Sequence, residues 1–274
     1  LYQLYYFKSE KHHSILSLVL MMLIYTVISF WKLGSTSFPT TTWKPTAEKQ
    51  QITFDFGKSE KFDAIYTIYG EGDTNSNPST YQIGTNNIHL YASNDLQEWV
   101  HIASLKQGNI YTYAIEQGNW QYRYIKLVDL SENSSLSEIG FRNEDHTGFL
   151  PISILRDKQK DGPYPGSLLI DEQDKLVLSP TYYDQAYFDE IYHVRNAWEI
   201  ANGQYMYANV HPLLGTNIIA LSIRLFGMHP FAWRLPGAIA GVFMLPVLFG
   251  ILKLLFKRND LSLIGSFLLA ADFM

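Results

Sequence analysis

Hydrophobic residues are concentrated towards the two ends of this chain, whereas the middle alternates between apolar and polar positions. Ser14 to Trp31 and Leu235 to Leu252 carry no charged residue. A helix of this length can cross the hydrocarbon core of a bilayer. The pattern therefore predicts transmembrane helices at residues 14–31 and 233–256, and the apolar run at residues 261–274 begins a third.

A shorter apolar stretch lies between His211 and Arg224 and is too short to cross a bilayer comfortably. Its larger apolar residues recur at helical spacing, which places them on one face: Leu214, Ile218, Leu221 and Leu225. We therefore expect an amphipathic helix that lies along the membrane surface.

Basic residues set the expected orientation, because positive charge gathers on the cytoplasmic side. Histidines and lysines precede the first apolar run, and Lys257 and Arg258 follow the second. We expect residues 1–13 in the cytoplasm and residues 33–230 outside, in a multi-pass protein of the cell membrane, with a bacterial plasma membrane as the expected location. A signal peptide is the alternative for the first run, but no small-residue cleavage site follows it.

Both ends of the chain look like cuts. It starts at Leu1, not at methionine, and it stops at Met274 inside an apolar run. We therefore expect the N-terminal part of a longer protein.

The polar middle predicts β-structure. Alternating segments begin at Ile52, Ile65, Ile88 and Tyr122, and turn-rich stretches such as residues 70–78 separate them. Several short strands at this spacing predict an extracytoplasmic β-sandwich. Residues 146–186 then resemble a linker, with a turn at residues 161–166 and a small hairpin over residues 168–178.

Four pieces of the middle, in order, resemble the discoidin (coagulation-factor type C) domains. They are residues 52–58, 92–99, 123–127 and 137–141. The resemblance implies a jelly-roll sandwich over residues 45–145, whose loops often bind glycans or lipid head groups. A membrane-anchored carbohydrate-binding module is therefore one hypothesis for the function.

Composition excludes several chemistries. The chain has no cysteine, so it has neither disulfides nor thiolate sites. The net charge is −5 without a dense basic cluster, which argues against a nucleic-acid partner. No glycine-rich phosphate loop supports a nucleotide-sugar donor, and no spacing of histidines and carboxylates predicts a metal site.

The segment from Tyr187 to Gly203 predicts a helix outside the membrane, with Gly203 as its C-terminal cap. Asp189 and Glu190 fall in its first turn, where the helix dipole favours carboxylates. Asp189 and His193 are four residues apart and share a face. From spacing alone, such an acidic pair is more typical of a helix cap than of catalysis.

Motifs at residues 187–193, 210–215, 225–235 and 268–274 resemble, in that order, those of the protein O-mannosyltransferases and their bacterial relatives. The resemblance implies an α + β membrane protein: a multi-spanning glycosyltransferase of type C, with the β-sandwich in its first outer loop and juxtamembrane helices at residues 187–230. Members transfer a sugar, typically mannose, from a polyprenyl-phosphate carrier to a Ser or Thr hydroxyl of a protein.

On this resemblance Asp189 is the catalytic base, with Glu190 beside it. His193, His211 and Arg234 fall on motif positions, and we expect them to bind the substrate or the lipid phosphate. The alternative for Arg234 is an interfacial positive charge at the start of a transmembrane helix, and the alternative for His211 is a helix-start residue before Pro212. The expected partners are the lipid-linked donor, a protein or glycan acceptor and membrane lipids. No cofactor is implied, although a divalent cation beside the acidic pair is left open.

Two positions depart from the family pattern. Asn209 replaces an acidic residue, and Leu213 and Thr216 change the motif that follows His211. These changes bear on acceptor or phosphate contacts and leave the acidic pair intact.

A transporter is a third hypothesis, disfavoured because the two complete spans carry essentially no charged residue.

Overall fold

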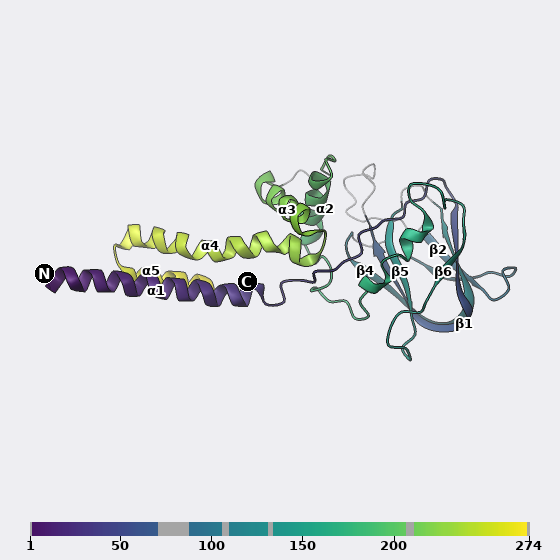
Figure 1. Cartoon of the computed structure of the whole chain (residues 1–274), viewed down its shortest axis with the longest axis horizontal. Helices are drawn as coiled ribbons and strands as arrows, with labels where there is room; N and C mark the ends of the chain where they lie inside the picture. The colour runs from purple at the N-terminus through teal and green to yellow at the C-terminus, as the bar shows by residue number, and fades with distance from the viewer. Residues whose placement is uncertain (1, 71–87, 106–109, 131–133, 207–210, 273–274) are drawn as a thin grey trace. The chain divides into compact units, whose positions relative to one another are not determined.

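The computed structural model describes residues 2–70, 88–105, 110–130, 134–206 and 211–272, with side chains from residue 13 onwards (Figure 1). Most of the predicted turn at residues 70–78, and the motif position Asn209, lie outside the described residues. The chain divides into two compact units. Residues 1–33 and 234–274 form the helical unit, and residues 34–233 form the central unit.

The helical unit contains the apolar helices. These are α1 (Tyr2–Phe30), most of α4 (Pro230–Phe256) and α5 (Asn259–Ala271). The segment His13–Phe30, with mean hydropathy 2.0, and α4, with mean hydropathy 2.3, are long and apolar enough to cross a membrane. These two helices coincide with the two predicted spans, and α5 is a shorter apolar helix.

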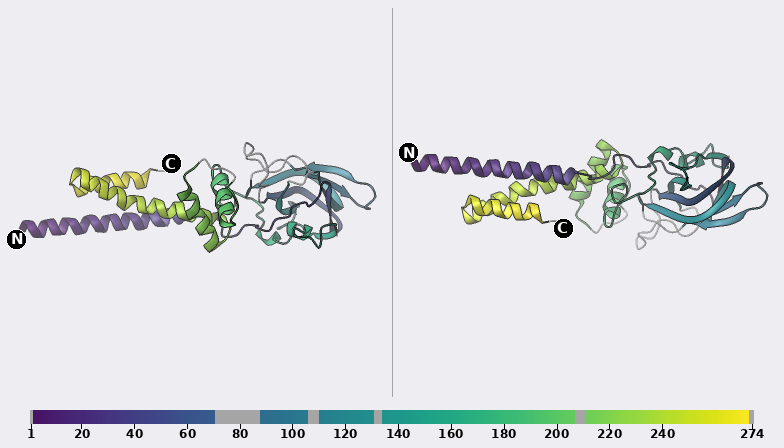
Figure 2. Two further views of the ribbon diagram at one scale, coloured as in Figure 1. Left: turned by 90° about the horizontal axis from the view of Figure 1, so that it is seen from above. Right: turned by 90° about the horizontal axis from the view of Figure 1, so that it is seen from below.

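Small residues let α5 approach α4, and Figure 2 shows the two helices side by side. Ser262 and Ser266 are fully buried, and the Ser266 hydroxyl donates a hydrogen bond to the Leu245 carbonyl at 3.3 Å. A Cβ atom at Gly265 would lie 2.2 Å from the Leu252 side chain. Close packing through serine and glycine is typical of membrane helices, which gain no hydrophobic stabilisation from one another in lipid.

The central unit contains one antiparallel sheet, whose described strands run in the order β3-β2-β4-β1-β5, with β6 also paired to β1. This confirms that the polar middle forms a β-domain, and its strands pair antiparallel. The strands are β1 (Gln50–Tyr69), β2 (Ile88–Ser93), β3 (Val100–Ser104), β4 (Tyr113–Asp129), β5 (Leu136–Arg142) and β6 (Ser153–Asp157).

Strand β1 is long because the predicted strands at Ile52 and Ile65 are one continuous element. Its register with β4 shifts between Asp55 and Glu60, next to Gly57, whose φ of +80° suits glycine. The bulge bends β1, so that its first half pairs with β6 and its second half with β5. The predicted sandwich is thus one hydrogen-bonded sheet among the described strands, wrapped around a single core.

The β-domain extends beyond the predicted limits of 45–145. Trp43, Leu150 and Leu169 are fully buried in its core, and β6 belongs to its sheet. The predicted hairpin over residues 168–178 is wrong. Two short 3₁₀ helices, η1 (Gly166–Leu169) and η2 (Gln173–Lys175), stand there because Leu169 packs into the core.

A second core joins the β-domain to two helices, α2 (Glu190–Ala201) and α3 (Leu213–Phe226). Phe38 lies at its centre, with edge-on ring contacts to Tyr111, Tyr113 and Trp233 at centroid distances of 6.2, 6.3 and 6.1 Å. The helices contribute small and aliphatic side chains: Val194, Ala197, Ala220 and Ile223. The β-domain and the helices that carry the acidic motif therefore share one packed interior.

Candidate active site at the start of helix α2

The two carboxylates of the acidic motif have different surroundings. Helix α2 begins at Glu190, and not at Tyr187 as predicted, because Phe188 just before it has a left-handed backbone with φ of +50°. The Glu190 carboxylate accepts a hydrogen bond from the Tyr187 backbone N–H at 3.0 Å. Asp189 is exposed, and its side chain makes no capping hydrogen bond. Glu190 therefore fixes the turn that leads into the helix, and the Asp189 side chain takes no part in capping it.

Asp189 lines a pocket of about 450 Å³. One wall comes from Thr112 and Tyr113, at the start of strand β4 in the β-domain. The other wall comes from the segment that leads into α2 and from its first turn: Gln185, Ala186, Tyr187, Phe188, Ile191 and Tyr192. The candidate base thus lies in an open pocket to which the β-domain contributes one wall.

Hydrogen bonds fix the two walls to each other. The Tyr113 backbone N–H donates to the Gln185 side-chain oxygen at 2.8 Å, and the Ala186 N–H donates to the Tyr111 carbonyl at 3.0 Å. The Tyr113 hydroxyl accepts from the Val177 N–H at 3.2 Å, and burial raises its pKa to about 12. Tyr113 therefore stays neutral at physiological pH.

Two of the predicted substrate-binding residues come together. The rings of His193, on α2, and His211, just before α3, have centroids 4.9 Å apart and planes inclined by 42°. Arg224 of α3 holds the two helices together, since its guanidinium donates to the carbonyls of Ile200 and Ala201 at distances of 2.7 to 3.2 Å. The predicted C-terminal cap is confirmed, because Gly203 has φ of +69° directly after α2.

Arg234 belongs to the helical unit and not to the unit that holds the histidines. Its Nη1 donates to the Leu33 carbonyl at 3.0 Å, which ties α4 to the end of α1. The structure therefore brings together four of the five predicted site residues on or beside α2.

Sequence reasoning missed an ion pair on α2. The Arg195 guanidinium lies 3.0 Å from the Glu199 carboxylate, and their side chains are only 6% and 3% exposed. The spacing of four residues was visible in the sequence. Such pairs usually mark the solvated face of a helix, so nothing in the sequence pointed to their burial.

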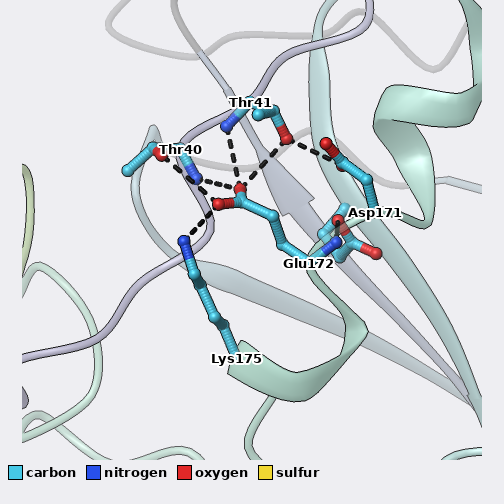
Figure 3. Close-up of polar contacts among 6 residues, drawn as sticks. Thr40, Thr41, Asp171, Glu172 and Lys175 are labelled. Atoms are coloured by element: carbon cyan, nitrogen blue, oxygen red, sulfur yellow. Dashed lines mark hydrogen bonds and ion pairs between the residues drawn. The ribbon is translucent and has the colours of Figure 1, made fainter.

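An acidic cluster lies in the β-domain and not at the acidic motif. Among the described residues, Glu138, Asp171 and Glu172 form the grouping of three side chains whose ligand oxygens lie within 4.8 Å of one another. Figure 3 shows Glu172 accepting from the backbone and hydroxyl of Thr41 and from Lys175. Burial raises the Glu138 pKa to about 8. The hydrogen bonds between Thr41 and Glu172 hold the segment before β1 against the turn between η1 and η2.

Strands β2, β3 and β4 and the residue before β3 carry a line of four rings and one ammonium group, which we call the aromatic row: Trp99, Lys126, Tyr91, His101 and His89. The Lys126 ammonium lies 4.0 Å from the Trp99 ring centroid and 5.5 Å from that of Tyr91. The Ser104 hydroxyl bridges His89 Nδ1 at 2.8 Å and His101 Nε2 at 3.0 Å. The row offers flat rings and polar groups side by side.

No model of a protein family matches the chain. Its sequence is similar to polyprenol-phosphate-mannose–protein mannosyltransferases over about a third of its length. The relative from Mycobacterium tuberculosis is 30% identical over 91 residues, which are 31% of this chain and 17% of that protein. The relative from Mycolicibacterium smegmatis is 29% identical over 100 residues, 34% of this chain and 19% of that protein. The resemblance seen in the sequence motifs is thus confirmed, although the chain spans less than a fifth of these relatives.

The solved structures to which the chain is similar include two carbohydrate-binding modules. CpGH89CBM32-6, produced by Clostridium perfringens, is 21% identical, with a TM-score of 0.31, over 41% of this chain and 82% of that one. A pectin-binding carbohydrate-binding module is 16% identical, with a TM-score of 0.28, over 38% of this chain and 72% of that one.

Proposed function

We propose that this chain is part of a membrane glycosyltransferase that moves mannose from a polyprenyl-phosphate carrier to a Ser or Thr hydroxyl of a protein. The observation that carries the proposal is the state of Asp189. This carboxylate is exposed, takes no part in capping its helix and opens onto a pocket. The sequence similarity to the mannosyltransferases supports the donor class.

In this proposal Asp189 acts as the general base. It takes the proton from the acceptor hydroxyl while that oxygen forms a bond to the anomeric carbon of the sugar. The bond from the anomeric carbon to the carrier phosphate breaks, and the phosphate keeps the electron pair. Since phosphate is a good leaving group, no strong general acid is required. Such base assistance contributes ~10²–10⁴-fold in rate.

Glu190 positions the base. Its hydrogen bond with the Tyr187 N–H fixes the turn that presents Asp189. His193 and His211 together offer ring N–H groups that suit phosphate or sugar oxygens. Arg234 remains the candidate for a bidentate contact with the carrier phosphate.

We also propose the location on the outer membrane face, with the N-terminus in the cytoplasm. Helix α3 supports it, because the predicted apolar face is exposed: Leu214, Ile218, Leu221 and Leu225 are 46% to 72% exposed. Its opposite face, with Ala220 and Ile223, packs into the second core. This arrangement suits a helix lying at the lipid surface.

The test uses the full-length protein in membranes supplied with polyprenyl-phosphate-mannose and a Thr-containing peptide. Asp189→Asn should lower mannose transfer at least ~100-fold, as loss of a general base does. The matched control is Asp161→Asn, which neutralises an exposed aspartate elsewhere in the same unit. Equal transfer by wild type and Asp189→Asn would show that Asp189 is structural.

The aromatic row favours a second candidate function, glycan binding by the β-domain. Sugar C–H faces stack on aromatic rings, while hydroxyls bond to neighbouring imidazoles and ammonium groups. Full-length protein immobilised in nanodiscs would be probed with a glycan array. Trp99→Ala and Tyr91→Ala should each remove binding. If both variants bind as the wild type does, the row is not the glycan site.

A further inference from the structure

We infer that the pocket beside Asp189 is the acceptor subsite, and that the β-domain selects the acceptor polypeptide through Thr112 and Tyr113. This inference rests on the proposed function. It extends that function by assigning the selection of the acceptor to a wall of the site that lies outside the motifs shared with the mannosyltransferases.

The position of the pocket follows from the chemistry. A hydroxyl that gives its proton to Asp189 must approach the carboxylate to about 2.6–3.2 Å. Consecutive Cα atoms are about 3.8 Å apart, so the residues flanking the acceptor Ser or Thr fall within the same pocket. Its β-domain wall, formed by Thr112 and Tyr113, is therefore within reach of a flanking side chain.

The lining indicates which flanking residues fit. Four aromatic residues line the pocket, namely Tyr113, Tyr187, Phe188 and Tyr192. Tyr187 and Phe188 are 66% and 76% exposed, so they offer ring faces to a ligand. Asp189 is the one charged residue among the described lining residues. The pocket therefore suits apolar or basic flanking residues, and Asp189 repels acidic ones.

The pocket is preformed. Phe188 keeps a left-handed backbone, which is unfavourable for a non-glycine residue and persists only where its surroundings hold it. Those surroundings are the Tyr187–Glu190 hydrogen bond on one side and the Tyr113–Gln185 hydrogen bond on the other. A wall held in this way can discriminate between acceptors, because an acceptor side chain that does not fit can displace the wall only by breaking these hydrogen bonds.

The test changes the charge of the β-domain wall without touching the α2 motif. Thr112→Arg and Thr112→Glu are compared in full-length protein in membranes, with polyprenyl-phosphate-mannose as donor. Two peptides serve as acceptors, identical except for Glu or Lys next to the Thr. The matched controls are Gln121→Arg and Gln121→Glu, which place the same charges at an exposed position on β4, the strand that Thr112 directly precedes, outside the pocket.

We expect Thr112→Arg to shift the ratio of kcat/KM towards the Glu peptide by about three- to tenfold, and Thr112→Glu to shift it towards the Lys peptide. The KM for the donor should not change. Opposite shifts from two substitutions at the same position cannot arise from misfolding.

Transfer with an unshifted ratio in both Thr112 variants would overturn the acceptor subsite and leave the transferase standing. Preferential transfer to a free glycan over both peptides would overturn the assignment of a polypeptide acceptor. Absence of mannose transfer by the wild type would overturn the proposed function itself, and the subsite with it.

Discussion

The imidazole rings of His193 and His211 lie 4.9 Å apart although they come from different elements, one from α2 and the other from the turn that starts α3. Each was singled out by a separate sequence motif. Their contact means that the two motifs build one surface. That surface includes part of α2, the helix that begins directly after Asp189.

The first prediction concerns this histidine pair. Since residues in contact act together, their substitutions are not additive. His193→Ala and His211→Ala should each raise the KM for polyprenyl-phosphate-mannose several-fold, and the double variant should be little worse than either. Donor titrations of the four proteins measure this. A double variant whose loss equals the product of the two single losses would show that the histidines work independently.

The second prediction concerns the buried ion pair of α2. Removing one partner leaves the other charge buried, which typically costs about 3–5 kcal/mol. Glu199→Ala should therefore lower the thermal midpoint strongly. The double change Arg195→Met with Glu199→Leu should restore most of it, because both charges are gone and volume is retained. If the single variant melts within a degree of the wild type, the pair is not a structural element.

The third prediction concerns pH and Glu138. Its pKa is raised from the ordinary 4.5 to about 8, chiefly by burial. Between these values the folded state keeps a proton that the unfolded state has lost, so stability falls as pH rises from 4.5 to 8. Glu138→Gln cannot ionise. Its thermal midpoint should therefore gain on the wild type between pH 5 and pH 8.

The control for this pH dependence is Glu48→Gln, which changes an exposed carboxylate before β1. Its midpoint should follow that of the wild type at both pH values. A constant difference between Glu138→Gln and wild type would mean that Glu138 ionises normally in the folded protein.

The fourth prediction concerns the exposed face of α3 and uses the absence of cysteine from the chain. Leu221→Cys, labelled with a polarity-sensitive dye, should emit at shorter wavelength in lipid bilayers than in water and should be quenched by lipid-attached quenchers. The same dye at Glu98→Cys in the β-domain should behave as in water. Equal water-like spectra at both positions would place α3 away from the lipid.

The sequence was sufficient for features that depend on local pattern. The two long apolar helices follow from uncharged runs, and the end of α2 follows from the freedom of Gly203 to take a positive φ. The exposed leucines of α3 follow from helical periodicity. Each of these features is set by residues that are close together in the chain.

Features that depend on distant partners could not be predicted. Ser153 to Asp157 looked like linker because a strand of five residues with exposed positions has little pattern, and only its pairing with β1 defines it. The pocket wall at Thr112 and Tyr113 carries no motif. It joins the site only because Tyr113 and Gln185, far apart in sequence, share a hydrogen bond.

The second core, which contains Phe38, has a mechanical consequence. Because Tyr111 and Tyr113 of the β-domain and Val194 and Ala197 of α2 pack into the same interior, the β-domain cannot swing independently of the helix that begins beside Asp189. Anything the β-domain holds is kept at a set distance from that carboxylate. In the proposed transferase, an acceptor chain bound by the β-domain would therefore receive the sugar at a fixed distance from the bound segment.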